Sequence, residues 1–307
     1  MGEKVRVRDV GPRDGLQMAK TRMDTAAKSR WIAAMAVAGV PEIEVGSFVP
    51  ARVIPQMADT DAIVREAVKI SNLIVVALVP NVRGAQAAHA AGAHRLTVPI
   101  SVSEGHSRAN LNRSPGQQVE EIRGIVKWAH SQERKLPVEA AMSTAFGCSI
   151  DGVVPQDKTV RLAEKLAAAG ADAVVLADTV GYAFPTQIKS VVRAMRAVIG
   201  EKLTALHLHD TCGLGLANVL AGLEEGVRAF DGALAGLGGC PYAPGASGNI
   251  VTEDLVFMLE SMGFETGIDL QKLIESRRLL HEGLPAEPMH GQVSKAGIPK
   301  TFGAATA

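Results

Sequence analysis

Two histidines separated by one residue form a possible metal-binding pair in the segment LHLHDT, residues 206–211. In a β-strand, alternate side chains point to the same face, so His207 and His209 would face one way with Cα atoms roughly 6.5–7 Å apart. Two imidazoles in that arrangement can bind one divalent cation. The alternative is a pair of hydrogen-bonded core histidines.

The segment GPRDG, residues 11–15, contains an aspartate and an arginine that could complete such a site. Asp14 supplies a carboxylate, and a set of two imidazoles and one carboxylate with open positions favours Mg²⁺ or Mn²⁺, with Zn²⁺, Fe²⁺ or Co²⁺ also possible. Arg13 supplies a fixed positive charge for a carbonyl oxygen or a carboxylate, unless it forms only a salt bridge. A hydrolase that uses a metal-bound hydroxide remains open at this point.

A repeating pattern along the chain supplies strands that would position these residues. An Ala-rich amphipathic segment leads into a short, largely β-branched run in residues 31–47, 85–100, 162–178 and 219–234. Apolar runs bring the strand candidates to eight at 5–10, 73–80, 137–146 and 203–210. Such continuous apolar runs are typical of strands buried on both faces of a parallel sheet.

Eight strands that alternate with helices in about 260 residues predict an α/β fold, the TIM (β/α)₈ barrel. Helices are expected at 24–38, 59–70, 117–134, 157–169, 185–199 and 214–225, with additional C-terminal helices near 250–262 and 269–282. A doubly wound sheet is the alternative, but no G-x-G-x-x-G segment follows the first strand. Residues 1–285 are therefore expected to form one catalytic domain and residues 286–307 a flexible, loosely packed tail.

The predicted barrel places several charged residues at one end of the molecule. In this fold the chemistry lies at the C-terminal ends of the strands. Glu44 and Asp178 follow predicted strands, as Asp14 and His207 do. A lone Asp after a strand is most often a helix N-cap. The coincidence of four such positions at the same end favours a shared site.

Composition and terminal sequence exclude several functional classes. The chain has 307 residues, with 32 basic and 32 acidic side chains and a pI near 7.1, so no charge footprint indicates nucleic acid or an anionic membrane as a partner. Three cysteines do not make a disulfide framework and suit a reducing compartment. Neither a signal peptide nor an apolar run of roughly 18 residues is found. These features predict a cytoplasmic protein.

One of the three cysteines lies in an unusual place. Residues 235–249 read AGLGGCPYAPGASGN, and their glycines and prolines predict a long loop that contains Cys240. Free cysteine is more commonly a small buried hydrophobe. The position of Cys240 in so glycine-rich a loop therefore indicates a chemical role more than a packing role.

Four segments together resemble the 3-hydroxy-3-methylglutaryl-CoA lyases. They are VGPRDGLQ, IEVGSFVPARVIPQM, LHLHDTCGLGLAN and AGLGGCPYAPGASGNIVTEDLVFML, and the resemblance runs from about residue 5 to residue 280. It implies a metallolyase that splits 3-hydroxy-3-methylglutaryl-CoA into acetyl-CoA and acetoacetate. It also implies a Mg²⁺ or Mn²⁺ cofactor, a small acyl-CoA substrate and a homodimer. Related condensing synthases typically carry H-x-H-N-D and lack the cysteine loop, so a Claisen-type synthase is disfavoured.

The resemblance also implies roles for individual residues. The cation ligands would be Asp14, His207, His209 and Asn249. The catalytic arginine would be Arg13 and the catalytic cysteine Cys240, with Asp14, Glu44 and Asp178 at further catalytic positions. Substrate contacts are expected for Arg13, Gln17, Lys20, Ser47, Ser103 and Thr179.

The fifth predicted strand departs from the family pattern. Glu139, Ala141 and Thr144 stand where the family has arginine, tyrosine and cysteine. Loss of the tyrosine ring opens space beside the substrate. Alternatives with the same mechanism are therefore a citramalyl-CoA lyase or a lyase of a longer branched 3-hydroxyacid. A barrel kept only for binding is a further alternative, but it leaves the metal and cysteine residues unexplained.

Overall fold

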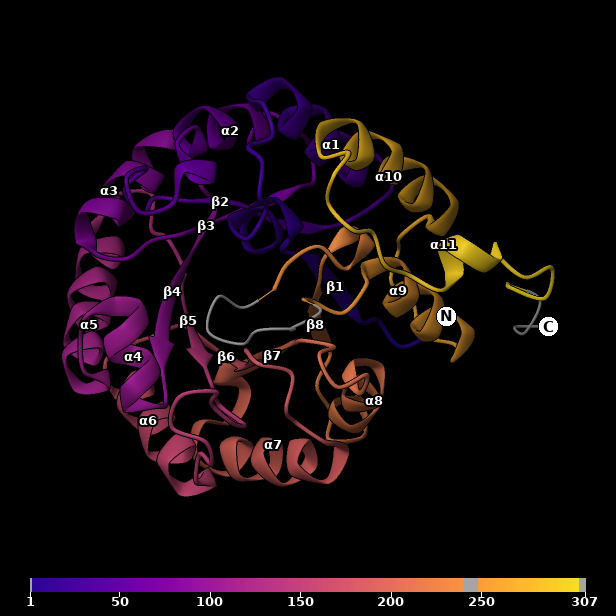
Figure 1. Ribbon diagram of the computed structural model, residues 1–307. Helices are drawn as coiled ribbons and strands as arrows, with labels where there is room; N and C mark the ends of the chain where they lie inside the picture. The colour runs from indigo at the N-terminus through magenta and orange to yellow at the C-terminus, as the bar shows by residue number, and fades with distance from the viewer. Residues whose placement is uncertain (1, 240–247, 304–307) are drawn as a thin grey trace.

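Eight parallel strands close into a barrel in the order β1 to β8, which confirms the predicted TIM barrel (Figure 1). The structure is a computed structural model that describes residues 2–239 and 248–303. The strands are β1 Arg6–Asp9, β2 Glu42–Ser47, β3 Ile74–Leu78, β4 Arg95–Ser101, β5 Val138–Ser143, β6 Ala173–Asp178, β7 Leu203–Leu208 and β8 Ala229–Gly232. Direct pairing of β1 with β8 closes the barrel.

Helices α1 to α8 surround the strands, and three further helices lie on the side where the chain begins (Figure 1). Their bounds are α1 Thr25–Val37, α2 Thr60–Ala67, α3 Val82–Ala91, α4 Glu104–Leu111, α5 Pro115–Ser131, α6 Gln156–Ala168, α7 Pro185–Ile199, α8 Gly215–Glu224, α9 Thr252–Ser261, α10 Leu270–Gly283 and α11 Val293–Ala296. In the described part of the chain, no helix combines the length and the apolar character needed to cross a membrane.

Local sequence signals explain where many of these helices begin and end. Helix α5 begins at a capping box, in which the Ser114 side chain accepts from the Gln117 backbone and the Gln117 side chain accepts from Ser114. Helix α3 ends at Gly92, whose φ of 101° suits only a residue without a Cβ atom. The glycines that end the Ala-rich segments therefore act as helix terminators.

Helix α4 was not predicted from the sequence. Its eight residues bury only His106 and Ser107, so they show no apolar stripe that periodicity could detect. The helix begins because the Ser103 side chain accepts a hydrogen bond from the His106 backbone N–H at 3.1 Å. Ser103, expected to contact substrate, is thus the N-cap of α4.

The barrel interior contains both apolar and charged side chains. Val175, Ala205 and Ala229, on the neighbouring strands β6, β7 and β8, form a small buried cluster of their own. The main core lies between the strands and the helices, where Trp31 and Met35 of α1 are fully buried. Charged side chains occupy much of the remaining interior, and this polar part contains the candidate site.

The segment after residue 285 differs from the loosely packed tail that its composition predicted. The Asp254 carboxylate of α9 accepts hydrogen bonds from the backbone N–H groups of Gln292, at 2.8 Å, and Val293, at 2.9 Å. Phe302 stacks on Phe257 with ring centroids 5.3 Å apart. A carboxylate and an aromatic ring on α9 therefore hold a segment whose own sequence has little apolar periodicity.

Candidate active site

The chain leaves β1 through a single π-helical turn, Gly11–Gly15, that presents Arg13 and Asp14 at the barrel mouth. The Val10 carbonyl accepts hydrogen bonds from the backbone N–H groups of Arg13, at 3.1 Å, and Asp14, at 2.7 Å. A Cβ atom on Gly15 would lie 3.0 Å from the Leu237 side chain, so glycine permits the close approach of the segment after β8. The tight turn therefore brings the β1 and β8 ends together.

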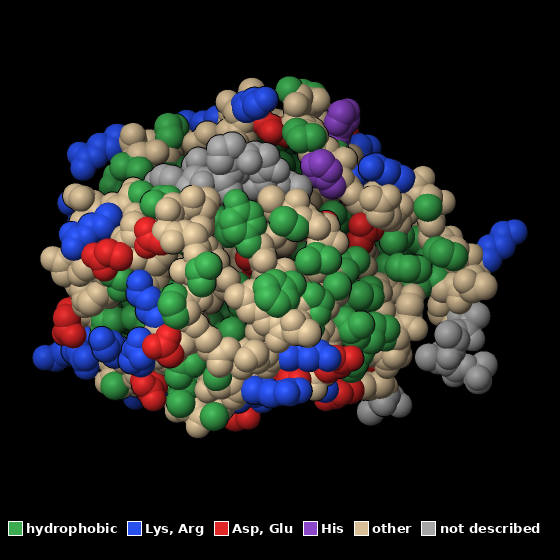
Figure 2. Space-filling model, turned by 60° about the horizontal axis from the view of Figure 1, so that its bottom comes forward, with side chains coloured by type: hydrophobic (Ala, Val, Ile, Leu, Met, Phe, Trp, Pro, Cys, Tyr) green, Lys and Arg blue, Asp and Glu red, His purple; other side chains and the backbone are tan. Residues whose placement is uncertain are grey.

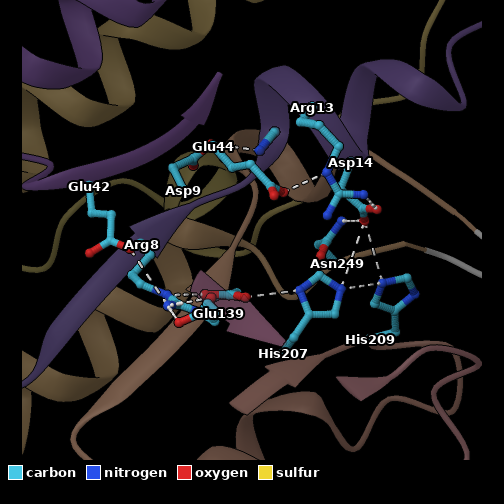
Figure 3. A network of polar contacts seen from close by, with 12 residues as sticks. Arg8, Asp9, Arg13, Asp14, Glu42, Glu44, Glu139, His207, His209 and Asn249 are labelled. Carbon is cyan, nitrogen blue, oxygen red and sulfur yellow. Dashed lines mark hydrogen bonds and ion pairs between the residues drawn. The ribbon is translucent and has the colours of Figure 1, made fainter. Parts of the chain in front are cut away.

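His207 and His209 face the same way from the end of β7, as their spacing predicts (Figure 3). Their Nε2 atoms lie 3.0 Å apart. The Asp14 Oδ2 atom lies 3.8 Å from Nε2 of His207 and 3.6 Å from Nε2 of His209. Among the described residues, these three side chains form a group that could hold a metal ion.

Asn249 joins this cluster from the described segment that begins at residue 248. It pairs with His209 in an isolated antiparallel bridge, and its Nδ2 donates to Asp14 Oδ2 at 2.8 Å. Its Oδ1 atom is buried and has no hydrogen-bond partner among the described residues. A buried amide oxygen without a partner is costly, and a cation would satisfy it. Helix α9 begins only at Thr252, so Asn249 is not its N-cap.

Arg13 is held between two carboxylates. Its Nε donates to Glu44 Oε2 at 2.5 Å and its Nη1 to Asp14 Oδ1 at 2.6 Å. Burial alone would raise the pKa of Asp14, but Arg13 and the two imidazoles outweigh it and lower that pKa well below its ordinary value. Burial raises the pKa of Glu44, although Arg13 opposes the shift. The two acids therefore differ in how readily they accept a proton.

A buried charge network, which was not predicted from the sequence, lies beneath the cluster. Arg8 donates from Nε to Asp231 at 2.5 Å and from Nη1 to Glu139 at 2.9 Å (Figure 3). The Asp231 Oδ2 atom lies 3.2 Å from His207 Nδ1. Burial by itself would raise the pKa of Asp231, but Arg8 and His207 lower it to about 2. An ionised Asp231 accepts the Nδ1–H of His207, which leaves the Nε2 lone pair free for a metal.

Replacing Asp231 with asparagine should weaken divalent-cation binding by about 10- to 100-fold, the usual effect of losing a carboxylate behind a metal-binding histidine. The amide cannot accept from both Arg8 and His207, so the imidazole loses its fixed orientation. Calorimetric titration with Mn²⁺ measures the affinity. Asp172→Asn is the matched control, because Asp172 also contacts a histidine, His130, but at a more exposed position. Equal affinities of the two variants would contradict the role of Asp231.

One cavity of about 200 Å³ joins these groups inside the barrel. Of the residues expected at the site, it is lined by Arg13, Asp14, Gln17, Glu44, Thr179, His207 and His209. Asn249 reaches it through Asp14. Cys240 lies outside the described residues, and its neighbour Gly239 lines the cavity.

Besides Asn249, four of the expected site residues that the structure describes do not line the cavity. The Asp178 carboxylate accepts from the backbone N–H groups of Tyr182 and Ala183, both at 3.0 Å, so it stabilises the turn after β6. Ser47 Oγ accepts from the Val49 backbone, Ser103 caps α4, and the Lys20 side chain is exposed. The Ser103 hydroxyl also donates to the Asp151 carboxylate at 2.7 Å. These four side chains therefore contact neighbouring protein groups or solvent, and they do not face the cavity.

Similarity to known proteins agrees with this architecture. A family model described as HMGL-like matches residues 4–280. A hydroxymethylglutaryl-CoA lyase of Bacillus subtilis is 38% identical over 96% of this chain and 98% of its own length. An (R)-citramalyl-CoA lyase of Chloroflexus aurantiacus is 39% identical over 96% of this chain and 95% of its own length.

Solved structures show the same relationship. An HMG-CoA lyase from Acinetobacter baumannii, in complex with coenzyme A and 3-methylmalate, superposes with a TM-score of 0.91 at 39% identity, covering 97% of this chain and 96% of that one. The carboxyl transferase domain of Rhizobium etli pyruvate carboxylase, at 21% identity and a TM-score of 0.70, shares the fold. With its family-model match and its relatives of known activity, the chain belongs to the HMGL-like family and is a carbon–carbon lyase.

Proposed function

We propose that this chain is a divalent-metal-dependent lyase that cleaves 3-hydroxy-3-methylglutaryl-CoA to acetyl-CoA and acetoacetate by retro-aldol, or retro-Claisen, cleavage. The observation that carries the proposal is the cluster of Asp14, His207 and His209 beside Arg13 at the ends of the strands. The relative from Bacillus subtilis with this activity spans nearly the whole chain. The structure with bound coenzyme A supports an acyl-CoA substrate.

The donor set fits a divalent cation such as Mg²⁺ or Mn²⁺. Asp14, His207 and His209 would hold it, and the buried Oδ1 of Asn249 would be the fourth ligand atom. When bound, such an ion polarises the 3-hydroxyl group of the substrate and lowers its pKa. The strongly lowered pKa of Asp14 keeps this carboxylate charged, as a ligand must be.

The side chains around the cluster supply the remaining steps. Arg13, fixed by Glu44 and Asp14, offers positive charge to the thioester oxygen as the departing acetyl-CoA becomes an enolate. Glu44 has a raised pKa and a buried Oε1 without a hydrogen-bond partner among the described residues, so it is better suited than Asp14 to accept the hydroxyl proton. Cys240 would then donate a proton to the enolate carbon.

An assay of purified protein with 3-hydroxy-3-methylglutaryl-CoA tests the proposal. Acetyl-CoA and acetoacetate should form in equal amounts with Mg²⁺ or Mn²⁺ present. Product formation should stop after chelation and return when the cation is restored. Absence of cleavage under cation-replete conditions would overturn the proposed substrate.

Citramalyl-CoA is a second candidate substrate, cleaved by the same mechanism. The relative from Chloroflexus aurantiacus that acts on it is as similar to this chain as the hydroxymethylglutaryl-CoA lyases are. Ala141 lines the cavity and leaves room for a different acyl group. Comparison of kcat/KM for the two thioesters decides between them, since the larger value identifies the preferred acyl group.

Replacing Cys240 with alanine should lower turnover by about a hundredfold while divalent cations still bind, because a general acid is removed but no ligand is. Steady-state kinetics and Mn²⁺ titration measure the two effects. Cys212→Ala is the control, since Cys212 is an exposed free cysteine. Normal turnover of the Cys240 variant would exclude this thiol as the acid.

Replacing Asn249 with alanine should weaken both cation binding and turnover, each by about 10- to 100-fold. The variant loses the unpartnered Oδ1 atom and the hydrogen bond to Asp14. Asn81→Ala serves as control, because Asn81 caps α3 and should affect only thermal stability. If cation affinity stays normal, Asn249 is not a ligand.

We also propose that the chain forms a homodimer. Tyr182, Phe184 and Leu214 are exposed next to α7 and α8, and Figure 2 shows hydrophobic side chains gathered on that side of the molecule. Exposed apolar groups of this kind support association of a second copy. Light scattering after size-exclusion chromatography should give twice the monomer mass, and Phe184→Asp should reduce it. A monomeric wild type would contradict the proposal.

A further inference from the structure

The cavity continues below the metal cluster into a part of the barrel that the cleavage steps do not use. Glu139, Ala141 and Ser143 of β5 all line it, together with Arg8 and Asp231. Residues two positions apart on a strand face the same way and lie roughly 6.5 Å apart. Glu139 therefore lies two such steps below Ser143, and the cavity has substantial depth beneath the barrel mouth.

The small side chain of Ala141 leaves space unfilled in the wall of this lower cavity. Its strand neighbours Pro99 on β4 and Val175 on β6 also line the cavity. Ala141 is only partly buried, whereas the adjacent Ala140 and Met142 are fully buried. Side chains normally fill the interior of a barrel of this size. An accessible methyl group inside it marks space that a ligand can occupy.

Charged side chains whose charges are already matched form the floor of this space. Arg8 contacts Asp231, Glu139 and, at 3.6 Å, Glu42. Glu42 is also contacted by Arg95, at 2.6 Å, and by Arg6, at 3.7 Å. Three carboxylates thus face three guanidinium groups, of which that of Arg6 is half-exposed. Burial, together with the nearby Asp231 and Glu42, raises the pKa of Glu139 despite Arg8. A further carboxylate would add uncompensated negative charge here, whereas an uncharged group would not.

We propose that this lower pocket binds the C3 substituent of the acyl group, and that the preferred substrate is a 3-hydroxyacyl-CoA whose C3 substituent is an uncharged alkyl chain longer than methyl. The inference rests on the proposed function, because the metal cluster would hold the 3-hydroxyl directly above the pocket. Apolar side chains such as Val76, Leu78 and Val175 line the space through which the chain would pass. A methyl group would leave the space beside Ala141 unfilled.

The first test compares three 3-hydroxyglutaryl thioesters of coenzyme A that carry methyl, propyl or carboxyethyl at C3. For the wild type, kcat/KM should be about 15-fold higher for propyl than for methyl, from about fourfold per buried methylene. The carboxyethyl ester should be poorer than the propyl ester by at least about tenfold. A wild type that cleaves the methyl ester as well as the propyl ester, or better, would overturn the inference.

Substitutions that fill the pocket provide the second test. Ala141→Val should lower the propyl-to-methyl ratio of kcat/KM, and Ala141→Phe should bring it to one or below. Phenylalanine adds bulk without a hydroxyl group that would need a partner. Ala168→Phe is the control, because Ala168 is exposed on α6, and it should keep the wild-type ratio. An unchanged ratio in both Ala141 variants would also overturn the inference.

A binding measurement separates this inference from the proposed function. If no thioester is cleaved, the proposed function fails, but calorimetry on the chelated wild-type protein still compares the affinities of the methyl and propyl esters. The propyl ester should bind more tightly, and Ala141→Phe should remove the difference. Equal affinities in the wild type would contradict the pocket assignment whatever the activity.

Discussion

Replacing His207 with alanine should abolish stoichiometric binding of a divalent cation and lower kcat by at least about a thousandfold. The variant removes one of the Nε2 atoms that lie 3.0 Å apart and leaves Asp14 with one imidazole neighbour. Loss of Lewis-acid stabilisation of several kcal/mol corresponds to a rate loss of about this size. Metal analysis of dialysed protein and steady-state kinetics measure the two effects.

His130→Ala is the matched control for this variant. The His130 imidazole pairs with Asp172 at 2.9 Å on the outside of the barrel, and both side chains are partly exposed. The control should bind a cation and cleave substrate like the wild type. Circular dichroism of the His207 variant checks that the barrel still folds. Wild-type cation affinity in the folded variant would show that the metal site lies elsewhere.

Replacing Arg13 with lysine should lower kcat by about a hundred- to a thousandfold with little change in cation affinity. The guanidinium group uses Nε and Nη1 to contact Glu44 and Asp14 and still has donors available for the substrate. A lysine ammonium has no planar fork and cannot make these contacts at once. Removing one preorganised donor from an oxyanion site usually costs a factor of this size.

The distribution of the effect between kcat and KM tests the role of Arg13. An arginine that acts on the developing enolate should affect kcat much more than KM, because the charge appears only in the transition state. Arg30→Lys is the control, since Arg30 is exposed on α1. A loss confined to KM would assign Arg13 to ground-state binding alone. A loss of threefold or less in kcat/KM would show that Arg13 does not take part in the catalytic step.

Several features of the site were predictable from the sequence because their causes are local. Strands buried on both faces appear as short apolar runs, and glycines end the helices between them. Once the barrel is recognised, the C-terminal ends of its strands must meet. This rule predicted that Asp14, after β1, lies near His207 and His209 at the end of β7, and the structure places them within 4 Å of the Asp14 carboxylate. Alternation along β7 further predicted that both imidazoles face one way.

Other assignments required the folded chain. Ser103 and Asp178 follow strands, as reactive residues do, yet both bind backbone groups of the next turn. Sequence position alone cannot separate these two uses of a polar side chain. The Arg8–Glu139 pair joins residues 131 positions apart in the chain. Nothing in the sequence indicated that charged residues of β1 and β5 contact each other, because only closure of the barrel brings these strands close.

The sequence by itself determined the barrel and the placement of Asp14, His207 and His209 at one end of it, because periodicity, caps and strand ends are local properties. Only the tertiary structure decided the depth of the cavity, the partners of Arg8, and the contact between Asn249 and Asp14. These depend on contacts between β1, β5, β7 and the segment after β8. The acyl group that we propose for this cavity therefore depends on packing inside the closed barrel.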